Sequence, residues 1–161
     1  MTARTFQTVA IRRDWELRIP AYGSPMDMGE LQQIVRDSGS HFFDADTMRF
    51  FRSRADDYVY PGPDGWYFIT SEKHVAYTSS RTLNEPRKYT VRRMAINETA
   101  TAIRLDEFEA FQHFSTLTRA RTAARTLSHT GTDQCSVCHY HLVAKGDVTP
   151  CANCQRTGRK E

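Results

Sequence analysis

Four cysteines near the C-terminus have the residue type and spacing that most clearly support chemistry in this chain. Cys135 and Cys138 form one Cys-x2-Cys pair, and Cys151 and Cys154 form a second pair after twelve intervening residues. A Cys-x2-Cys loop turns two thiolates towards one ion, and two such loops complete a tetrahedral zinc site. The sequence therefore predicts one zinc ion bound by these four cysteines.

This zinc ion is expected to be structural. Four thiolates leave no coordination position for a substrate or a water molecule. A segment this short buries little apolar surface, so metal binding would supply its folding free energy, about 10–16 kcal/mol in comparable peptides. His139 and His141 follow the first pair, and either can replace a cysteine as a ligand. Redox-active thiols are the other interpretation of the pattern.

The distribution of cysteines also bears on the cellular compartment. The chain before Cys135 has no cysteine, so it carries no disulfide framework. Thiols confined to one cluster favour a metal site in a reducing cytoplasm. We find no N-terminal apolar run of signal-peptide length and no stretch near the roughly 18 apolar residues of a membrane span. We expect a cytoplasmic protein without a membrane partner.

Basic residues suggest a second type of site, for nucleic acid. The net charge of +3 is mild, and most of the excess lies after Cys135. Arg121 and Arg125 are four residues apart on a predicted helix and would share one stripe of its surface. The alternative is an ordinary solvated helix face. The residues that could contact phosphates are Arg119, Arg121, Arg125, Lys145, Arg156, Arg159 and Lys160.

A predicted strand at residues 89–96 carries further basic residues. Lys88 and Arg92 would lie on one face and Arg93 on the other, with aromatic residues between them. Such a surface can bind single strands of nucleic acid. The alternative, which we favour, is a half-exposed strand with charged edges.

Two polar groups resemble sites but have simpler explanations. Asp44 and Asp46, beside His41, fit the cap and first turn of a helix better than a metal site. Ser71, Glu72 and His74 do not converge as a hydrolytic triad would, because adjacent strand residues point to opposite faces. We find no phosphate loop, dinucleotide fingerprint or zinc-protease helix, and therefore predict no catalytic residue.

The elements that must position these residues follow from periodicity and from helix-capping and turn residues. Alternating apolar residues predict strands, apolar residues three or four apart predict helices, and Gly and Pro clusters predict turns. In order, the sequence predicts a hairpin over 6–19 turning near Arg13–Asp14, helices at 24–39 and 44–54, a turn at 60–65, a strand at 66–70, a loop at 76–86, strands at 89–96 and 99–105, a helix from Ser115 or Thr116 to Leu127, and a linker at 128–133.

This order predicts an α+β fold with a mostly antiparallel sheet and about three helices, plus a small C-terminal zinc ribbon. Residues 1–130 would form the α+β domain. Residues 131–161 would form the ribbon with its basic tail.

Part of the sequence resembles an uncharacterised family of small tailed-bacteriophage proteins. The resemblance rests on the segments SGSHFFDADTMRFFRSR at 38–54, YFITSE at 67–72 and RKYTVRR at 87–93, with a weaker match at Phe108-x-Ala110-Phe111. It covers about residues 38–127 and omits the N-terminal 37 residues and the ribbon. It implies a phage protein made in the host cytoplasm and brings no activity or functional residue with it.

The sequence therefore leaves three functions open. We expect a small zinc-binding phage protein that binds a host protein, in host takeover or counter-defence. The alternative is a nucleic-acid-binding protein that uses the ribbon and the basic helix. A nuclease or another enzyme is less favoured, because the sequence offers no cluster of carboxylates or histidines for it.

Overall fold

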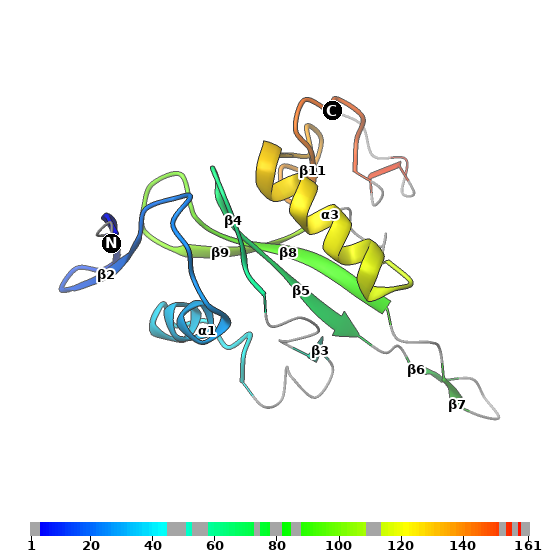
Figure 1. The fold of residues 1–161 in the computed structure, drawn as a ribbon, viewed down its shortest axis with the longest axis horizontal. Coiled ribbons are helices and arrows are strands. Elements are labelled where there is room, and N and C mark those ends of the chain that lie inside the picture. Colours follow the sequence, from blue (N-terminus) through cyan, green and yellow to red (C-terminus); the bar gives the residue numbers. More distant parts are fainter. Residues whose placement is uncertain are drawn as a thin grey trace.

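The computed structural model describes residues 4–44, 51–52, 58–72, 75–77, 82–84, 88–108, 114–151, 154–155 and 158. A sheet with one helix on each face forms the body, and the cysteine-containing segment lies at one end of the second helix (Figure 1). The fold is α+β with antiparallel strand pairing, as predicted. The elements are β1 (Phe6–Arg12), β2 (Trp15–Pro20), α1 (Met28–Asp37), β3 (Phe51–Arg52), β4 (Tyr60–Gly62), β5 (Gly65–Glu72), β6 (Val75–Tyr77), β7 (Thr82–Asn84), β8 (Lys88–Ile96), β9 (Ile103–Glu107), α3 (Leu117–Thr130), β10 (Thr132–Gln134) and β11 (Leu142–Ala144).

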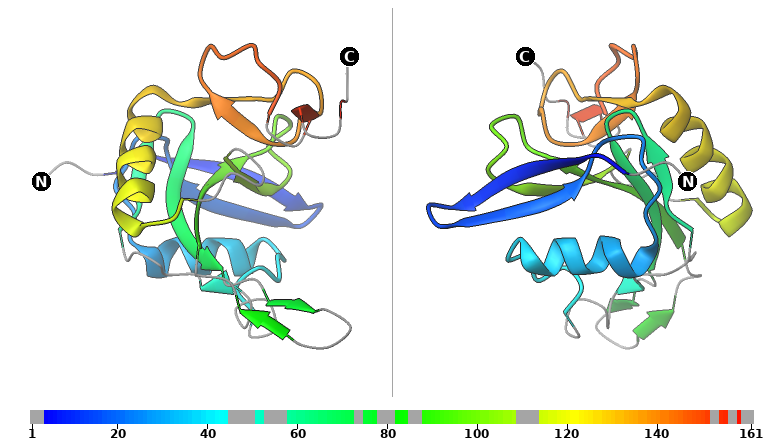
Figure 2. Two further views of the ribbon diagram at one scale, coloured as in Figure 1. Left: turned by 90° about the vertical axis from the view of Figure 1, so that its right-hand side faces the viewer. Right: turned by 60° about the vertical axis from the view of Figure 1, so that its left-hand side comes forward.

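The N-terminal hairpin forms as the alternation predicts. Strands β1 and β2 pair antiparallel across Arg13–Asp14, and Figure 2 shows the hairpin extending from the body. Helix α1 begins later than predicted, because Asp27 caps it instead of Ser24. The Asp27 carboxylate accepts the Glu30 N–H at 2.7 Å, which satisfies a donor that the first turn leaves unpaired.

The central sheet has the order β3-β5-β8-β9, with β4 also paired to β5. Strand β5 alternates its side chains between two cores. Trp66 and Phe68 contribute to a core beneath β1, β2 and α1, whereas Tyr67 and Ile69 contribute to a core beneath α3. A strand buried on both faces reads as a continuous apolar run, and residues 66–69 have that composition.

Helix α3 packs on the sheet through small residues. Thr116 caps it by accepting the Arg119 N–H at 3.2 Å, and Ala120, Ala124 and Leu127 are buried. The alanines let the helix axis approach the sheet closely. Gly62 permits a second close approach, because a Cβ atom at Gly62 would lie 2.9 Å from the Ser128 carbonyl oxygen.

The predicted linker at 128–133 is wrong. Residues 128–130 form the last turn of α3, and residues 132–134 form strand β10. Gly131, with φ of 85°, makes the reversal between them, so the helix passes directly into the C-terminal segment, residues 131–161. The division into domains 1–130 and 131–161 stays a prediction.

Three other expectations need correction. The helix predicted at 44–54 does not extend through Phe51–Arg52, which form β3, and most of its remaining residues lie outside the described part of the chain. The predicted loop at 76–86 contains strands β6 and β7, paired with each other. The turn predicted at 60–65 begins with strand β4, and only Pro63–Asp64 turn. Neither described helix is long and apolar enough to cross a membrane.

Candidate metal centre and basic groove

The C-terminal segment brings its four cysteines together around a short hairpin. Strands β10 and β11 pair antiparallel, and Cys135 and Cys138 lie in the loop between them. The His139 N–H donates to the Cys135 carbonyl at 2.9 Å, and His139 takes a positive φ of 56° to close this loop. After β11, a turn in which the Asp147 N–H donates to the Ala144 carbonyl returns the chain towards Cys151.

The sulfur geometry fits one tetrahedral metal ion. All four Sγ atoms lie within 4.8 Å of one another, and the pairs Cys135–Cys154 and Cys138–Cys151 are each 3.9 Å apart. Sulfurs bound at about 2.3 Å to a tetrahedral ion are about 3.8 Å apart. A disulfide requires about 2.05 Å, so these thiols are not oxidised to each other. The four residues could hold one metal ion.

The cysteines themselves make up most of the core of this segment. Cys135, Cys151 and Cys154 are fully buried and pack with Val143. Few apolar side chains contribute beside them, so burial of apolar surface alone gives this core little stability. A metal ion bound by the four sulfurs would therefore contribute directly to folding.

Backbone donors stabilise the thiolate of Cys135. Burial raises the pKa of this thiol, but N–H groups of Cys151, Cys138 and Val137 outweigh burial and lower the pKa to about 6. The Cys151 and Val137 N–H groups lie 3.3 and 3.4 Å from the Cys135 sulfur. Burial raises the pKa of Cys151 to about 12 and also raises the pKa of Cys154. A cation in the cluster would compensate the charge that burial disfavours.

His141 lies against one edge of the cluster. Its Nδ1 atom is 3.7 Å from the Cys138 sulfur and 3.8 Å from the Cys151 sulfur. It does not belong to the set of mutually close ligand atoms, which contains the four cysteines alone among the described residues. In this position His141 could donate a hydrogen bond to a thiolate sulfur. His139, in contrast, is exposed.

A second site lies between α3 and β4, and we call it the α3–β4 groove. It consists of two adjoining cavities of about 670 and 820 Å³, which share Pro61, Arg125 and Ser128. Arg121 lines the first cavity and His129 lines the second, so the residues at positions 121, 125 and 129 follow one side of the helix.

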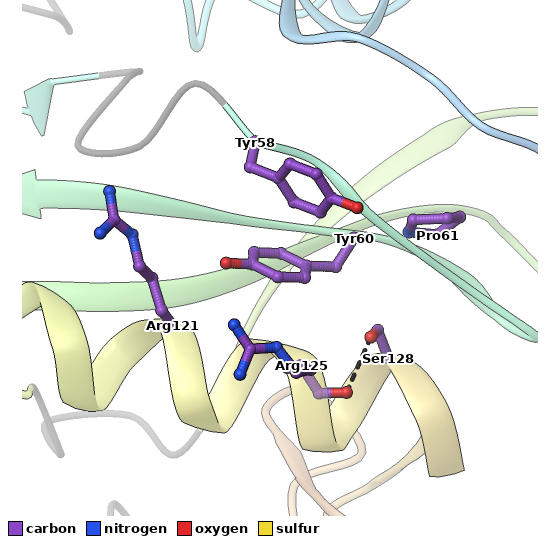
Figure 3. Close-up of a pocket in the computed structure, with 6 residues that line it drawn as sticks. All are labelled: Tyr58, Tyr60, Pro61, Arg121, Arg125 and Ser128. Carbon is purple, nitrogen blue, oxygen red and sulfur yellow. Dashed lines mark hydrogen bonds between the residues drawn. The ribbon is translucent and has the colours of Figure 1, made fainter.

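Tyrosines form the opposite wall of the α3–β4 groove. Tyr58 and Tyr60 line the first cavity, and their rings pack edge to face with centroids 4.6 Å apart. In Figure 3 the Tyr60 ring and the guanidinium groups of Arg121 and Arg125 extend from opposite walls into the space between β4 and α3. Tyr22 lines the second cavity and is held by the Ile96 N–H, which donates to its hydroxyl at 2.9 Å.

The groove unites only part of the basic set predicted from the sequence. Arg121 and Arg125 lie in it, whereas Arg119 is exposed on α3 and Lys145 lies in the turn after β11. The remaining predicted residues lie outside the described part of the chain: Arg156, Arg159 and Lys160. The tyrosines were missed, although Tyr58 and Tyr60 are two residues apart and therefore lie on one face of an extended strand.

The two arginines of β8 are buried and do not form a binding surface. Arg92 and Arg93 are each 8% exposed. The Arg92 Nε atom donates to Thr70 Oγ1 at 3.0 Å, and its guanidinium carbon lies 5.1 Å from the centre of the Phe42 ring. The single-strand hypothesis for this strand is therefore wrong, and so is the half-exposed alternative.

Arg93 instead joins the body to the C-terminal segment. Its guanidinium pairs with Asp64 and Asp106, each at 2.9 Å. Asp64 also accepts the Thr132 N–H and the Tyr67 hydroxyl, both at 2.9 Å. Because Thr132 begins β10, the Asp64 carboxylate fixes the start of the C-terminal segment on the sheet.

The other polar groups do not converge. The His41 Nδ1 atom lies 2.7 Å from a carboxylate oxygen of Asp44, and both side chains are largely exposed. Ser71 is buried in β5, opposite Tyr89. Asp46 and His74 lie outside the described residues.

Comparisons with known proteins give one family match. No curated protein and no solved structure matches the chain. The model of a family of unknown function, DUF7447, matches residues 27–125, more than half of the chain. This match ends within α3 at Arg125, so it includes most of the first cavity of the groove and omits the four cysteines. The chain therefore belongs to DUF7447, a family of unknown function.

Proposed function

We propose that this protein binds nucleic acid, does not act as an enzyme, and holds one structural zinc ion in its C-terminal segment. The observation that carries this proposal is the α3–β4 groove, where Arg121 and Arg125 face Tyr58 and Tyr60. Although the net charge of +3 is mild, the groove places two guanidinium groups in one hollow. Local positive charge of this kind attracts phosphates, and the groove therefore favours nucleic acid over a protein partner.

Zinc is the metal that fits the cysteine cluster best. Soft thiolate ligands select zinc, copper(I) or iron–sulfur clusters, and four thiolates spaced for one ion favour a single tetrahedral zinc. The fully buried sulfurs of Cys135, Cys151 and Cys154 support a structural role, because a closed site offers no position for a reacting molecule. In this proposal the zinc ion stabilises the C-terminal segment and takes no part in a reaction.

Metal analysis of the purified protein tests the zinc assignment. We expect one zinc per chain without added metal, and we expect its loss when Cys135 and Cys151 are both replaced by serine. An exposed-residue control, Ser136→Ala, should keep the zinc. A ratio near zero, or iron in place of zinc, would reject the assignment.

A salt titration tests nucleic-acid binding. Labelled single-stranded and double-stranded DNA and RNA should bind at low salt, and affinity should fall steeply towards physiological salt because neutralised phosphates release counterions. Replacing both Arg121 and Arg125 by alanine should weaken binding to every sequence and flatten the salt dependence. No binding to any of these molecules at low salt would reject the proposed function.

A host protein remains the second candidate partner, because Trp15 is exposed near the tip of the β1–β2 hairpin. Its exposed fraction is 50%, and it lies beside Ile11 and Arg36 in a small cavity. Exposed Trp and Arg are frequent anchors of protein interfaces. The sequence resemblance supports a phage origin and a location in the host cytoplasm. This second candidate would be favoured if a host protein is captured even after nuclease treatment, and if replacing Trp15 abolishes that capture.

A further inference from the structure

We propose that the α3–β4 groove binds a single strand of nucleic acid, with phosphates at Arg121 and Arg125 and a base stacked on Tyr58. This inference rests on the proposed function and specifies its ligand. A single strand exposes both phosphates and the faces of its bases, and the groove offers a cationic wall and an aromatic wall.

The cationic wall has the spacing of a helix face. Arg121, Arg125 and His129 are successive i, i+4 neighbours, so each is displaced by about 6 Å along the axis of α3. Helix α3 is fixed on the sheet by Ala120 and Ala124, both fully buried. The backbone at Arg121 and Arg125 is therefore held in place before a ligand binds, which lowers the entropic cost of binding.

Arg125 connects the two parts of the groove. It lines both cavities, whereas Arg121 lines only the first and His129 only the second among the described residues. A ligand that occupies both cavities must pass Arg125.

The aromatic wall offers a ring for stacking. Tyr58 is 59% exposed, whereas Tyr60 beneath it is 7% exposed. Tyr60 packs edge to face on Tyr58 and supports that ring, and it belongs to the core beneath α3. Stacking on an aromatic side chain tolerates any base, because every base has a π-face. We therefore expect weak sequence preference.

A single strand fits the two walls of the groove better than a duplex does. The walls are helix α3 and strand β4, and Gly62 and Ser128 line the second cavity between them. In a duplex the base faces are stacked inside the rod, so Tyr58 could reach only the backbone or groove edges. A single strand can place its phosphates against the cationic wall and a base against the aromatic wall at the same time.

Fluorescence anisotropy with the full-length, zinc-loaded protein tests the inference. The probes are a labelled oligothymidine of about 12 nucleotides, its RNA counterpart and a duplex of the same length, because a comparable single-strand site spans about 4–16 nucleotides. We expect a single strand to bind at least about tenfold more tightly than the duplex. Removal of one phosphate-binding arginine should reduce the salt slope by about 0.7, the value for one neutralised phosphate of a single strand.

Four variants locate the site. Arg125→Ala and Tyr58→Ala should each weaken single-strand binding about tenfold, within the range for a phosphate contact or a stacked base. Tyr58→Phe keeps the ring and should bind nearly as the wild type does. Arg119→Ala is the matched control, because Arg119 is exposed on the same helix and does not line the groove.

The outcomes separate the inference from the proposed function. Equal or tighter binding to the duplex would overturn the inference and leave nucleic-acid binding in place. No binding to any probe would overturn both, including the case in which a host protein is the sole partner found. An effect of Arg119→Ala as large as that of Arg125→Ala would also overturn the inference. Melting temperature and zinc content of each variant show that it is folded.

Discussion

Replacing Asp64 by alanine tests whether one carboxylate joins the C-terminal segment to the body. Asp64 accepts hydrogen bonds from Arg93, Tyr67 and the Thr132 N–H, each at 2.9 Å. Hydrogen bonds to a charged group contribute about 1.5–3 kcal/mol each. Two of the three donors keep another partner, because Arg93 retains Asp106 and Tyr67 retains the Thr132 hydroxyl.

The expected loss is therefore smaller than the sum of three bonds. The Asp64 side chain is 25% exposed, which reduces the electrostatic part further. We expect Asp64→Ala to lower the free energy of unfolding by about 3 kcal/mol, between the value of one charged hydrogen bond and that of a broken buried pair. For a chain of this size, this corresponds to roughly 6–12 °C in melting temperature.

Urea unfolding of the zinc-saturated protein measures this loss. Asp64→Asn keeps one carbonyl acceptor and should cost about half as much as alanine. Glu16→Ala on the exposed side of β2 is the control and should change stability by less than about 0.5 kcal/mol. If Asp64→Ala costs less than about 1 kcal/mol, or if alanine and asparagine cost the same, the proposed role of the charged acceptor is wrong.

Further tests concern other contacts of the body and of the metal centre. Burial raises the pKa of Tyr67 above its ordinary value of about 10. The folded protein therefore loses stability as the pH rises above about 10, where the unfolded chain ionises first. Alkaline unfolding curves of Tyr67→Phe should show a weaker pH dependence than those of the wild type. Gly62→Ala should cost about 1–3 kcal/mol in thermal unfolding, because its Cβ would lie 2.9 Å from the Ser128 carbonyl oxygen. His141→Ala should retain one zinc per chain but release it faster to a chelator, as measured with a coloured zinc indicator; an unchanged release rate would contradict a donor role for His141. A chain ending at Thr130 should still unfold cooperatively on heating but at a lower temperature than the full chain, and the absence of a transition would show that the body requires the C-terminal segment.

Local pattern predicted the elements that depend on near neighbours in the chain. The hairpin around Arg13–Asp14 and the start of α3 at Thr116 are correct. Helix α1 was also predicted, although it begins after its cap Asp27 and not at residue 24. These features follow from side-chain spacing within one element, which the sequence displays directly.

Features that depend on distant partners could not be predicted in this way. Pro61 and Gly62 suggested a turn, but pairing with β5 holds them in a strand at the edge of the sheet, where proline is tolerated. Arg92 and Arg93 looked like half-exposed charges. Arg93 is buried because Asp64 and Asp106, each far away in sequence, neutralise it.

The cysteine cluster and the groove show the same contrast. The cysteine spacing predicted that the four sulfurs share one site, because both pairs lie within a short segment. Predicting the groove requires knowing how α3 and β4 lie relative to each other, and no local sequence pattern contains that information. Arg121 and Arg125 were therefore identified as a pair, whereas their position opposite Tyr58 emerged only from the fold.

The direct passage from α3 into β10 has a consequence for the thermodynamics of the two sites. Arg125 lines the groove, and the same helix ends at Thr130, one residue before Gly131 and five before Cys135. A metal bound by the cysteines would hold the chain just after Gly131, and a ligand in the groove would contact the helix that ends just before it. Any coupling between these two binding free energies is reciprocal. If a bound metal multiplies the affinity of the groove for its ligand by some factor, a bound ligand multiplies the affinity for the metal by the same factor.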